Sequence, residues 1–135
     1  MRFGLSSEPL QALVDPSTAV GAVVTFVGLV RDENSGKPVR SLEYEAYDDL
    51  ALAEGGRILE EAGDRFPILD AVCVHRVGHL QLGDEAIRVE VVSAHRQEAF
   101  AACRWIVDEI KARVPIWKKE HYLDGASEWL NPVER

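Results

Sequence analysis

Hydrophobic residues recur along this chain with two different periods, and each period predicts one kind of secondary structure. Every second residue is apolar in residues 40–47 and 86–92, which is typical of a strand with one buried face. The apolar, β-branched residues 20–27 predict a strand that is covered on both faces and ends at Gly28. Residues 68–75 predict another apolar strand, so four strands are expected in this part of the chain.

Two longer segments, residues 50–62 and 97–113, place apolar or small residues on one helical face and predict amphipathic helices. Asp48 or Asp49 is expected to cap the first helix, because an aspartate side chain accepts hydrogen bonds from the free N–H groups at a helix start. Pro115 is expected to end the second helix, because the residue before a proline is driven out of the helical conformation.

Shorter segments complete the pattern. Residues 3–6 predict a short strand, residues 9–14 a helical turn with a proline near its start, and residues 32–38 a loop. Residues 116–123 are predicted to be extended, and the tail through Trp129 to return as a short strand. This order of strands and helices predicts an α+β fold, with a mixed or antiparallel sheet and two long helices packed on one face of it.

Length and cysteine content indicate one unit in a reducing compartment. The 135 residues contain no internal repeat or linker, which predicts a single domain over residues 1–135 with a core that needs no disulfides. Cys73 and Cys103 lie in apolar segments, as small buried residues do. With two cysteines and no secretory signal at the start, we expect a cytoplasmic protein.

The charges change this picture at one place. A formal net charge of −8 argues against a general nucleic-acid binder, which would carry a basic surface. The chain has four lysines against eleven arginines, yet three of the lysines lie within residues 111–120. Because the pKa of a lysine shifts readily on burial, this concentration predicts a local anion site with proton-transfer chemistry. A solvated basic helix end, favoured by the helix dipole, remains an alternative for Lys111.

A second anion site is predicted where the strand at residues 86–92 leads into the following helix. His95 and Arg96 lie there, and the free N–H groups of a helix start bind phosphate or carboxylate. A capping pair is the alternative. The helix would separate this pair from Lys111 by roughly 24 Å, so only a long groove would let them share a ligand.

Other motifs are absent or weak. Four residues could suggest a metal site: Cys73, His75, His79 and His121. Their spacing does not match a known pattern of metal ligands, so no metal is expected. Phosphate-binding glycine loops and a nucleophile elbow around a serine are also missing, which argues against nucleotide chemistry and serine hydrolases.

Four separated segments carry a family resemblance. They are VGLVRDEN, HRVGHLQLGD, VVSAHRQEAF and VDEIKARVPIWKKE. In this order they strongly resemble the large, catalytic subunit of molybdopterin synthase, the MoaE family, over about residues 20–129.

The resemblance implies an α/β-hammerhead fold and a homodimer within a heterotetramer. Each outer end of the dimer would hold a small ubiquitin-like, MoaD-like subunit with a C-terminal Gly-Gly thiocarboxylate. The enzyme would transfer sulfur from this group to cyclic pyranopterin monophosphate, also called precursor Z. The product would be the dithiolene of molybdopterin, in molybdenum cofactor biosynthesis, and no cofactor or metal is implied for the enzyme itself.

The resemblance also assigns residues. The substrate-contacting positions of the family fall on Leu29, Val30, Arg31, His95, Arg96, Lys111, Lys118, Lys119 and Glu120. Among them, Lys111 and Lys118 take the positions of the two essential catalytic lysines. The family often supplies a further arginine across the dimer from its C-terminal tail, and Arg135 is the only candidate here, at an offset position.

Two other functions remain open at this point. A non-catalytic adaptor would bind a ubiquitin-like tail, but it would need only a groove and no lysines. A phosphate-binding regulatory module would need Arg31, His95 and Arg96 alone.

Overall fold

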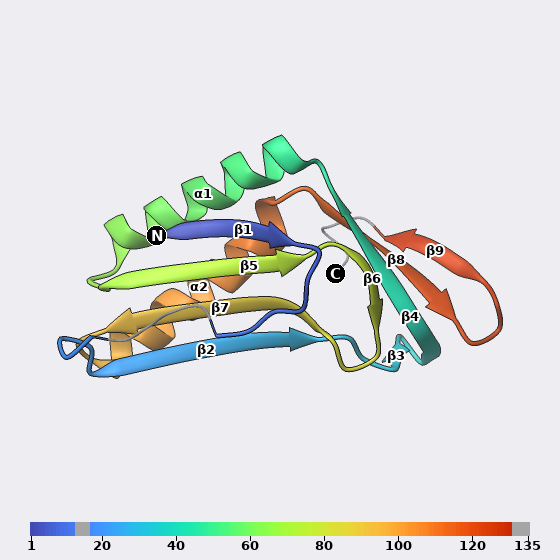
Figure 1. The fold of residues 1–135 in the computed structure, drawn as a ribbon, viewed down its shortest axis with the longest axis horizontal. Coiled ribbons are helices and arrows are strands. Elements are labelled where there is room, and N and C mark those ends of the chain that lie inside the picture. Colours follow the sequence, from blue (N-terminus) through green and yellow to red (C-terminus); the bar gives the residue numbers. More distant parts are fainter. Residues whose placement is uncertain (13–16, 131–135) are drawn as a thin grey trace.

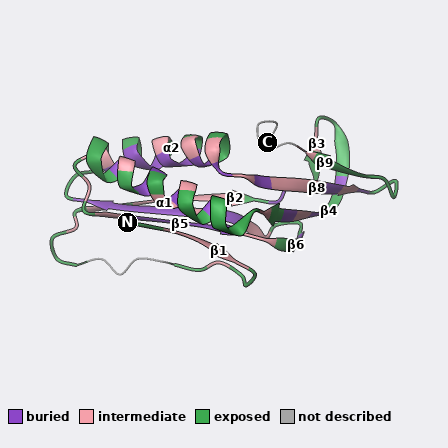
Figure 2. Ribbon diagram, turned by 90° about the horizontal axis from the view of Figure 1, so that it is seen from above, coloured by how far each residue is buried: buried purple, intermediate pink, exposed green. Residues whose placement is uncertain are grey.

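The computed structural model describes residues 1–12 and 17–130 and contains two β-sheets (Figure 1). The first sheet has a mixed strand order, because β1 runs parallel to β5 while the other neighbours are antiparallel. Its order is β1 (Arg2–Ser6), β5 (Asp70–Arg76), β7 (Glu85–Ser93) and β2 (Ala22–Leu29). Both long helices, α1 (Asp48–Arg65) and α2 (Arg96–Arg113), cover one face of this sheet (Figure 2).

The second sheet lies at one end of the first and is antiparallel (Figure 1). Its order is β3 (Glu33–Asn34), β4 (Lys37–Ala46), β8 (Ile116–Tyr122) and β9 (Ser127–Leu130). A short strand, β6 (Gly78–Gln81), also pairs with β4. The predicted α+β class, with two helices on a mixed sheet, is confirmed. Neither helix carries an apolar stretch long enough to span a membrane.

The core lies between the helices and the first sheet. Ile58 and Leu59 of α1 and Ile106 and Ile110 of α2 are completely buried there, as the 3.6-residue period predicts. Gly55 allows α1 to approach β1 closely, because a Cβ atom at this position would lie 2.3 Å from the ring of Phe3. A glycine is therefore required at this contact.

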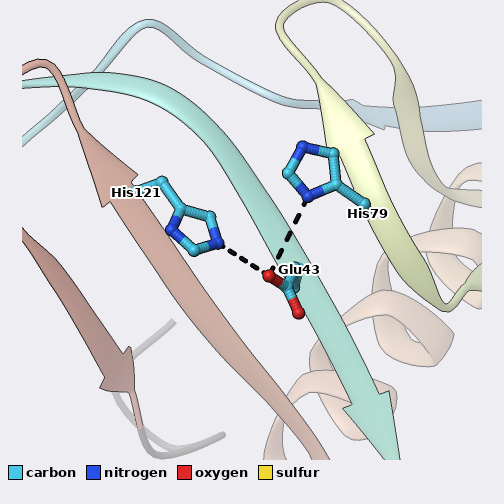
Figure 3. Close-up of side chains that lie close together, drawn as sticks. All are labelled: Glu43, His79 and His121. Carbon is cyan, nitrogen blue, oxygen red and sulfur yellow. Dashed lines mark hydrogen bonds and ion pairs between the residues drawn. The ribbon is translucent and has the colours of Figure 1, made fainter. Parts of the chain in front are cut away.

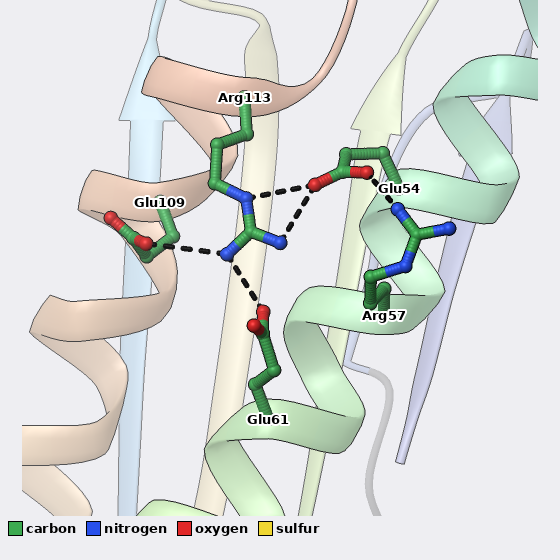
Figure 4. A network of polar contacts seen from close by, with 5 residues as sticks. All are labelled: Glu54, Arg57, Glu61, Glu109 and Arg113. Atoms are coloured by element: carbon green, nitrogen blue, oxygen red, sulfur yellow. Dashed lines mark hydrogen bonds and ion pairs between the residues drawn. The ribbon is translucent and has the colours of Figure 1, made fainter.

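An ionic cluster joins the two helices near the end of α2 (Figure 4). The guanidinium of Arg113 lies 2.7 Å from carboxylate oxygens of both Glu54 and Glu61 on α1, and 3.3 Å from Glu109 on its own helix. Arg57 pairs with Glu54 as well. The hydrogen bonds to Glu61, Glu54 and Glu109 raise the pKa of Arg113, although partial burial opposes this. The cluster holds the last turn of α2, and thus Lys111, against α1.

Two predictions near the N-terminus were wrong. Residues 9–12 are not helical, and the rest of the predicted helical turn, residues 13 and 14, lies outside the described part of the chain. The strand predicted at residues 20–27 is shifted, since β2 continues through Gly28 to Leu29 with an irregularity between these two residues. β2 is also not covered on both faces, because Val23 is 43% exposed.

Three further differences concern turns and caps. Residues 32–38 form the β3–β4 hairpin instead of an open loop, with Ser35 and Gly36 in the left-handed region at φ 52° and 79°. α1 starts at Asp48, so Tyr47 holds the cap position and no side chain caps the helix. No strand was predicted between residues 75 and 86, yet Gly78–Gln81 form β6. Pro115 does end α2, since Val114 leaves the helical conformation.

Replacing Gly55 with alanine should destabilise the protein by about 1–3 kcal/mol, because the new methyl group would overlap the Phe3 ring. Urea unfolding measures this change. The neighbouring Gly56 is the matched control, since a Cβ there meets nothing within 4 Å and alanine should stabilise the helix by about 0.5–1 kcal/mol. Equal stability of Gly55→Ala and the parent would contradict the close packing of α1 on β1.

Candidate active site

A cavity of about 190 Å³ lies between the two sheets and the end of α2. Its lining includes Leu29, Arg31, Tyr44, His75, Lys111 and Lys118. A smaller cavity, about 70 Å³, shares Leu29, Arg31, Tyr44 and Lys118 with the first and adds Val30 and Glu120. We call the two together the lysine cavity. It collects three cationic side chains from parts of the chain that lie far apart in sequence.

Two of the three cations of the lysine cavity come from the end of an element, and the third comes from the interior of a strand. Arg31 follows β2, Lys111 lies in the last turn of α2, and Lys118 is on β8. The chain reverses at Pro115, so that β8 runs back along β4 and Lys118 pairs in register with Tyr44. The amine of Lys111 lies 5.7 Å from the centroid of the Phe26 ring, at a cation–π distance.

The alternation of β8 separates Lys118 from Lys119. Lys118 lines the lysine cavity, whereas Lys119 lies on the opposite face of the strand, with its amine 5.4 Å from the centroid of the Trp129 ring. The next residue, Glu120, returns to the cavity side. Of these three neighbouring positions, the structure therefore places the first and the third at the cavity.

Glu120 is a buried carboxylate, with 2% of its surface exposed. The side-chain amide of Asn34 donates a hydrogen bond of 2.5 Å to its Oε1. Burial and the negative charge of Glu120 raise the pKa of the Tyr122 hydroxyl. Because a buried carboxylate is costly without partners, Glu120 and Asn34 form a preorganised polar wall between the β3–β4 hairpin and β8.

Two aromatic residues of the cavity, Tyr44 and His75, were not predicted as part of this site. His75 is 3% exposed, and its ring makes an edge contact with Tyr44 at a centroid distance of 4.7 Å. The His75 Nδ1 lies 2.7 Å from the carbonyl oxygen of Arg76, which can only accept, so this nitrogen carries a proton. In the neutral ring, Nε2 is then the basic nitrogen. The alternating pattern did place Tyr44 on a buried face, but no local pattern links β4 to β5.

His95 and Arg96 lie at the other end of α2. Both are exposed, and the hydroxyl of Ser93 accepts from the His95 backbone N–H at 3.1 Å and donates to the His95 carbonyl oxygen at 2.5 Å. The helix separates Arg96 from Lys111 by roughly 22 Å, so the structure does not bring this pair to the lysine cavity of its own chain. Arg135 lies outside the described residues.

A second hollow, about 440 Å³, lies between α2 and β2 and meets the lysine cavity at Lys111. Its lining is mainly apolar and includes Val24, Phe26, Phe100, Cys103 and Val107. Phe100 is 62% exposed, which is unusual for a large aromatic side chain. Burial raises the pKa of the Cys103 thiol to about 11, so this sulfur is not a thiolate at neutral pH.

Comparisons with known proteins agree on one family. The model of the MoaE protein family matches residues 4–113. A molybdopterin synthase catalytic subunit from Pyrococcus abyssi is 51% identical over 124 residues, which cover 88% of this chain and 83% of that protein.

Solved structures lead to the same result. The crystal structure of molybdopterin synthase from Staphylococcus aureus has a TM-score of 0.86 and 36% identity, over 94% of this chain and 95% of that one. The complex of subunits 1 and 2 of molybdopterin-converting factor from Helicobacter pylori shares the fold, with a TM-score of 0.68 at 21% identity and coverage of 87% and 75%. The family match and the identity to curated relatives together show that the chain belongs to the MoaE protein family.

Proposed function

We propose that this protein is the catalytic subunit of a molybdopterin synthase. It transfers sulfur from the C-terminal thiocarboxylate of a small ubiquitin-like subunit to cyclic pyranopterin monophosphate, and the product carries the dithiolene of molybdopterin. The observation that carries the proposal is the convergence of Arg31, Lys111 and Lys118 on one cavity from three separate elements. The curated relatives that share this family support it.

The chemistry of the lysine cavity fits this reaction. The substrate carries a phosphate, and the planar guanidinium of Arg31 is suited to hold it with two parallel hydrogen bonds. An ammonium group polarises the carbonyl of the acyl thiolate, and the same amine can give or take a proton while sulfur adds to the pterin. We assign both roles to the pair formed by Lys118 and Lys111, and proton transfer includes Lys118.

The apolar hollow beside α2 offers a path for the tail of the small subunit. It opens next to the exposed Phe100 and reaches Lys111, where it meets the lysine cavity. A Gly-Gly tail has no side chains, so its extended backbone can lie along this open hollow. Since the Cys103 thiol stays protonated, we propose that sulfur passes directly from the thiocarboxylate to the pterin and not through this cysteine.

His95 and Arg96 are proposed to act in a second copy of the chain. They cannot reach a small ligand beside Lys111 of their own chain, because α2 is too long. In a homodimer, the exposed N-terminal end of α2 of one chain would supply the histidine, the arginine and free backbone N–H groups to the cavity of the other chain. Lys119 lies on the far side of β8, and we assign it no contact within its own cavity.

The two alternative functions explain fewer of these observations. A non-catalytic adaptor would use the apolar hollow but would leave Lys118 without a role. A phosphate-binding module would use Arg31 but would not need an apolar passage that ends at Lys111.

Lys118→Ala should abolish product formation while leaving the fold and the complex with the small subunit intact. Lys118→Arg should also fail, because a guanidinium keeps its charge and does not give up its proton. The assay follows dithiolene product from precursor Z and a thiocarboxylated small subunit. Lys37→Ala is the control, since the Lys37 amine lies over the Tyr122 ring beside Asp124 and Lys37 is not a lining residue of the lysine cavity, so its loss should leave the rate unchanged. Full activity of Lys118→Arg would remove proton transfer from this position.

Arg31→Ala should weaken the binding of precursor Z about ten- to a hundredfold, the equivalent of about 1.5–3 kcal/mol for a lost charge-assisted hydrogen bond. Titration calorimetry measures this directly. Arg65→Ala is the matched control, because Arg65 is exposed in the last turn of α1, lies over the Trp105 ring, and lines neither the lysine cavity nor the hollow beside α2. If both variants bind the substrate like the parent, Arg31 does not hold the phosphate.

Mixing two inactive variants tests the dimeric site. One variant carries Lys118→Ala and the other carries Arg96→Ala. In a hybrid dimer, one cavity lacks both Lys118 and the Arg96 of the other chain, and the second cavity has both residues intact. After unfolding and refolding together, random pairing should restore about a quarter of the parental activity, because half of the dimers are hybrids with one intact cavity. Each variant refolded alone should stay inactive. No recovery in a mixture that forms hybrid dimers would place Arg96 in the cavity of its own chain, or outside it.

A further inference from the structure

A second cluster of chemically active side chains, Glu43, His79 and His121, lies on the second sheet (Figure 3). Because side chains alternate along β4 and Tyr44 lines the lysine cavity, the neighbouring Glu43 lies on the opposite face of the sheet. Glu43 of β4 is in register with His79 of β6 on one side and with Lys119 of β8 on the other. His121 is two residues further along β8, so it lies diagonally across from Glu43 on the same face. Three strands therefore each supply one side chain to this cluster.

The three side chains are close enough to share one ion. The His121 Nε2 lies 2.8 Å from the Glu43 Oε1, and the His79 Nδ1 lies 3.9 Å from the same oxygen. All three ligand atoms are within 4.8 Å of one another. Ligands about 2.1 Å from a tetrahedral metal are about 3.4 Å apart, so small side-chain rotations would bring these atoms to coordination distance. His79, whose side chain is 48% exposed, has room to make such a rotation.

The donor set selects a class of ion. Two imidazoles and one carboxylate form one of the known sets of three protein ligands for Zn²⁺, and water occupies the fourth coordination position in such sites. Mg²⁺ and Ca²⁺ prefer sites made of oxygen alone. The hydrogen bond with His121 lowers the pKa of Glu43, with smaller contributions from the charges of His121, Lys119 and His79, so the carboxylate is ionised at neutral pH.

Lys119 is the neighbouring charge that opposes a cation here. Its amine is held over the Trp129 ring, where the aromatic face stabilises its charge. Glu45, two residues beyond Glu43 on the same face of β4, adds a negative charge, and the chain as a whole carries a formal charge of −8. Without a metal, the cluster is a hydrogen-bonded histidine–carboxylate pair with a second histidine beside it.

We propose that Glu43, His79 and His121 form a binding site for one divalent transition-metal ion of the Zn²⁺ class. The ion would join β6 and β8 across β4. The turn that follows β6 is hydrogen-bonded to Val30, which lines the lysine cavity. The Val30 N–H donates to the Asp84 carbonyl oxygen at 3.0 Å, and the Gly83 N–H donates to the Val30 carbonyl oxygen at 2.9 Å. The metal thus stabilises the scaffold of the cavity from behind and does not contact the substrate.

Calorimetric titration of Zn²⁺ into the metal-free full chain at pH 7.5 tests the site, and Co²⁺ absorption reports its coordination. The parent should bind one ion per chain, and Zn²⁺ should raise its unfolding temperature. Glu43→Gln, His79→Gln and His121→Gln should each weaken binding at least tenfold and remove the thermal shift. Because His79 is largely exposed, His79→Gln should keep the parental circular dichroism spectrum.

Glu45→Gln is the matched control, because it removes the same charge from the same face of β4 without removing a proposed ligand. It should bind Zn²⁺ within about twofold of the parent. Binding should also weaken when the pH is lowered from 7.5 to 5.5, because a protonated imidazole cannot bind a metal ion. Equal weakening by Glu45→Gln and Glu43→Gln, or parental binding by His79→Gln, would overturn the site in favour of diffuse attraction to an acidic surface.

Discussion

The antiparallel pairing of β4 with β8 is the constraint on which the candidate active site depends. Tyr44 opposite Lys118, and Leu42 opposite Glu120, place these side chains on the face that lines the lysine cavity. A slip of one residue in this register would turn Lys118 away from the cavity and bring Lys119 in, because side chains alternate along a strand. The reversal at Pro115 sets where this pairing begins, since it ends α2 and starts β8.

The positions of the arginines and lysines follow from this arrangement. Arg113 is held by three carboxylates between α1 and α2, and Arg88 pairs with the buried Glu90 at 2.7 Å on β7. Such planar, permanently charged groups suit fixed structural contacts. The lysine cavity instead receives two amines, whose protonation state responds to the surroundings. Arg88 and Arg113 thus stabilise the fold, whereas Lys111 and Lys118 lie in the cavity where they can take part in chemistry.

The two faces of the second sheet carry different side chains, because side chains alternate along each strand. One face carries Lys118 and Glu120 toward the lysine cavity, and the other carries Glu43 and His121 away from it. β8 is central to both faces, so any ligand that orders one face also orders the strand that supplies the other. The proposed substrate site and the proposed metal site therefore both draw side chains from β8, on opposite faces of the strand.

Local periodicity determined the helices and most strands, and Pro115 determined the end of α2, because each of these is encoded within one continuous segment. The family was indicated by the resemblance of four separated segments. The concentration of lysines in residues 111–120 likewise marks the site within a single stretch of sequence. Only the tertiary structure decided that β6 joins β4, that His75 and Tyr44 complete the cavity, and that His79 meets His121 beside Glu43. These contacts depend on which strands become neighbours and in which register, and a single segment does not carry that information.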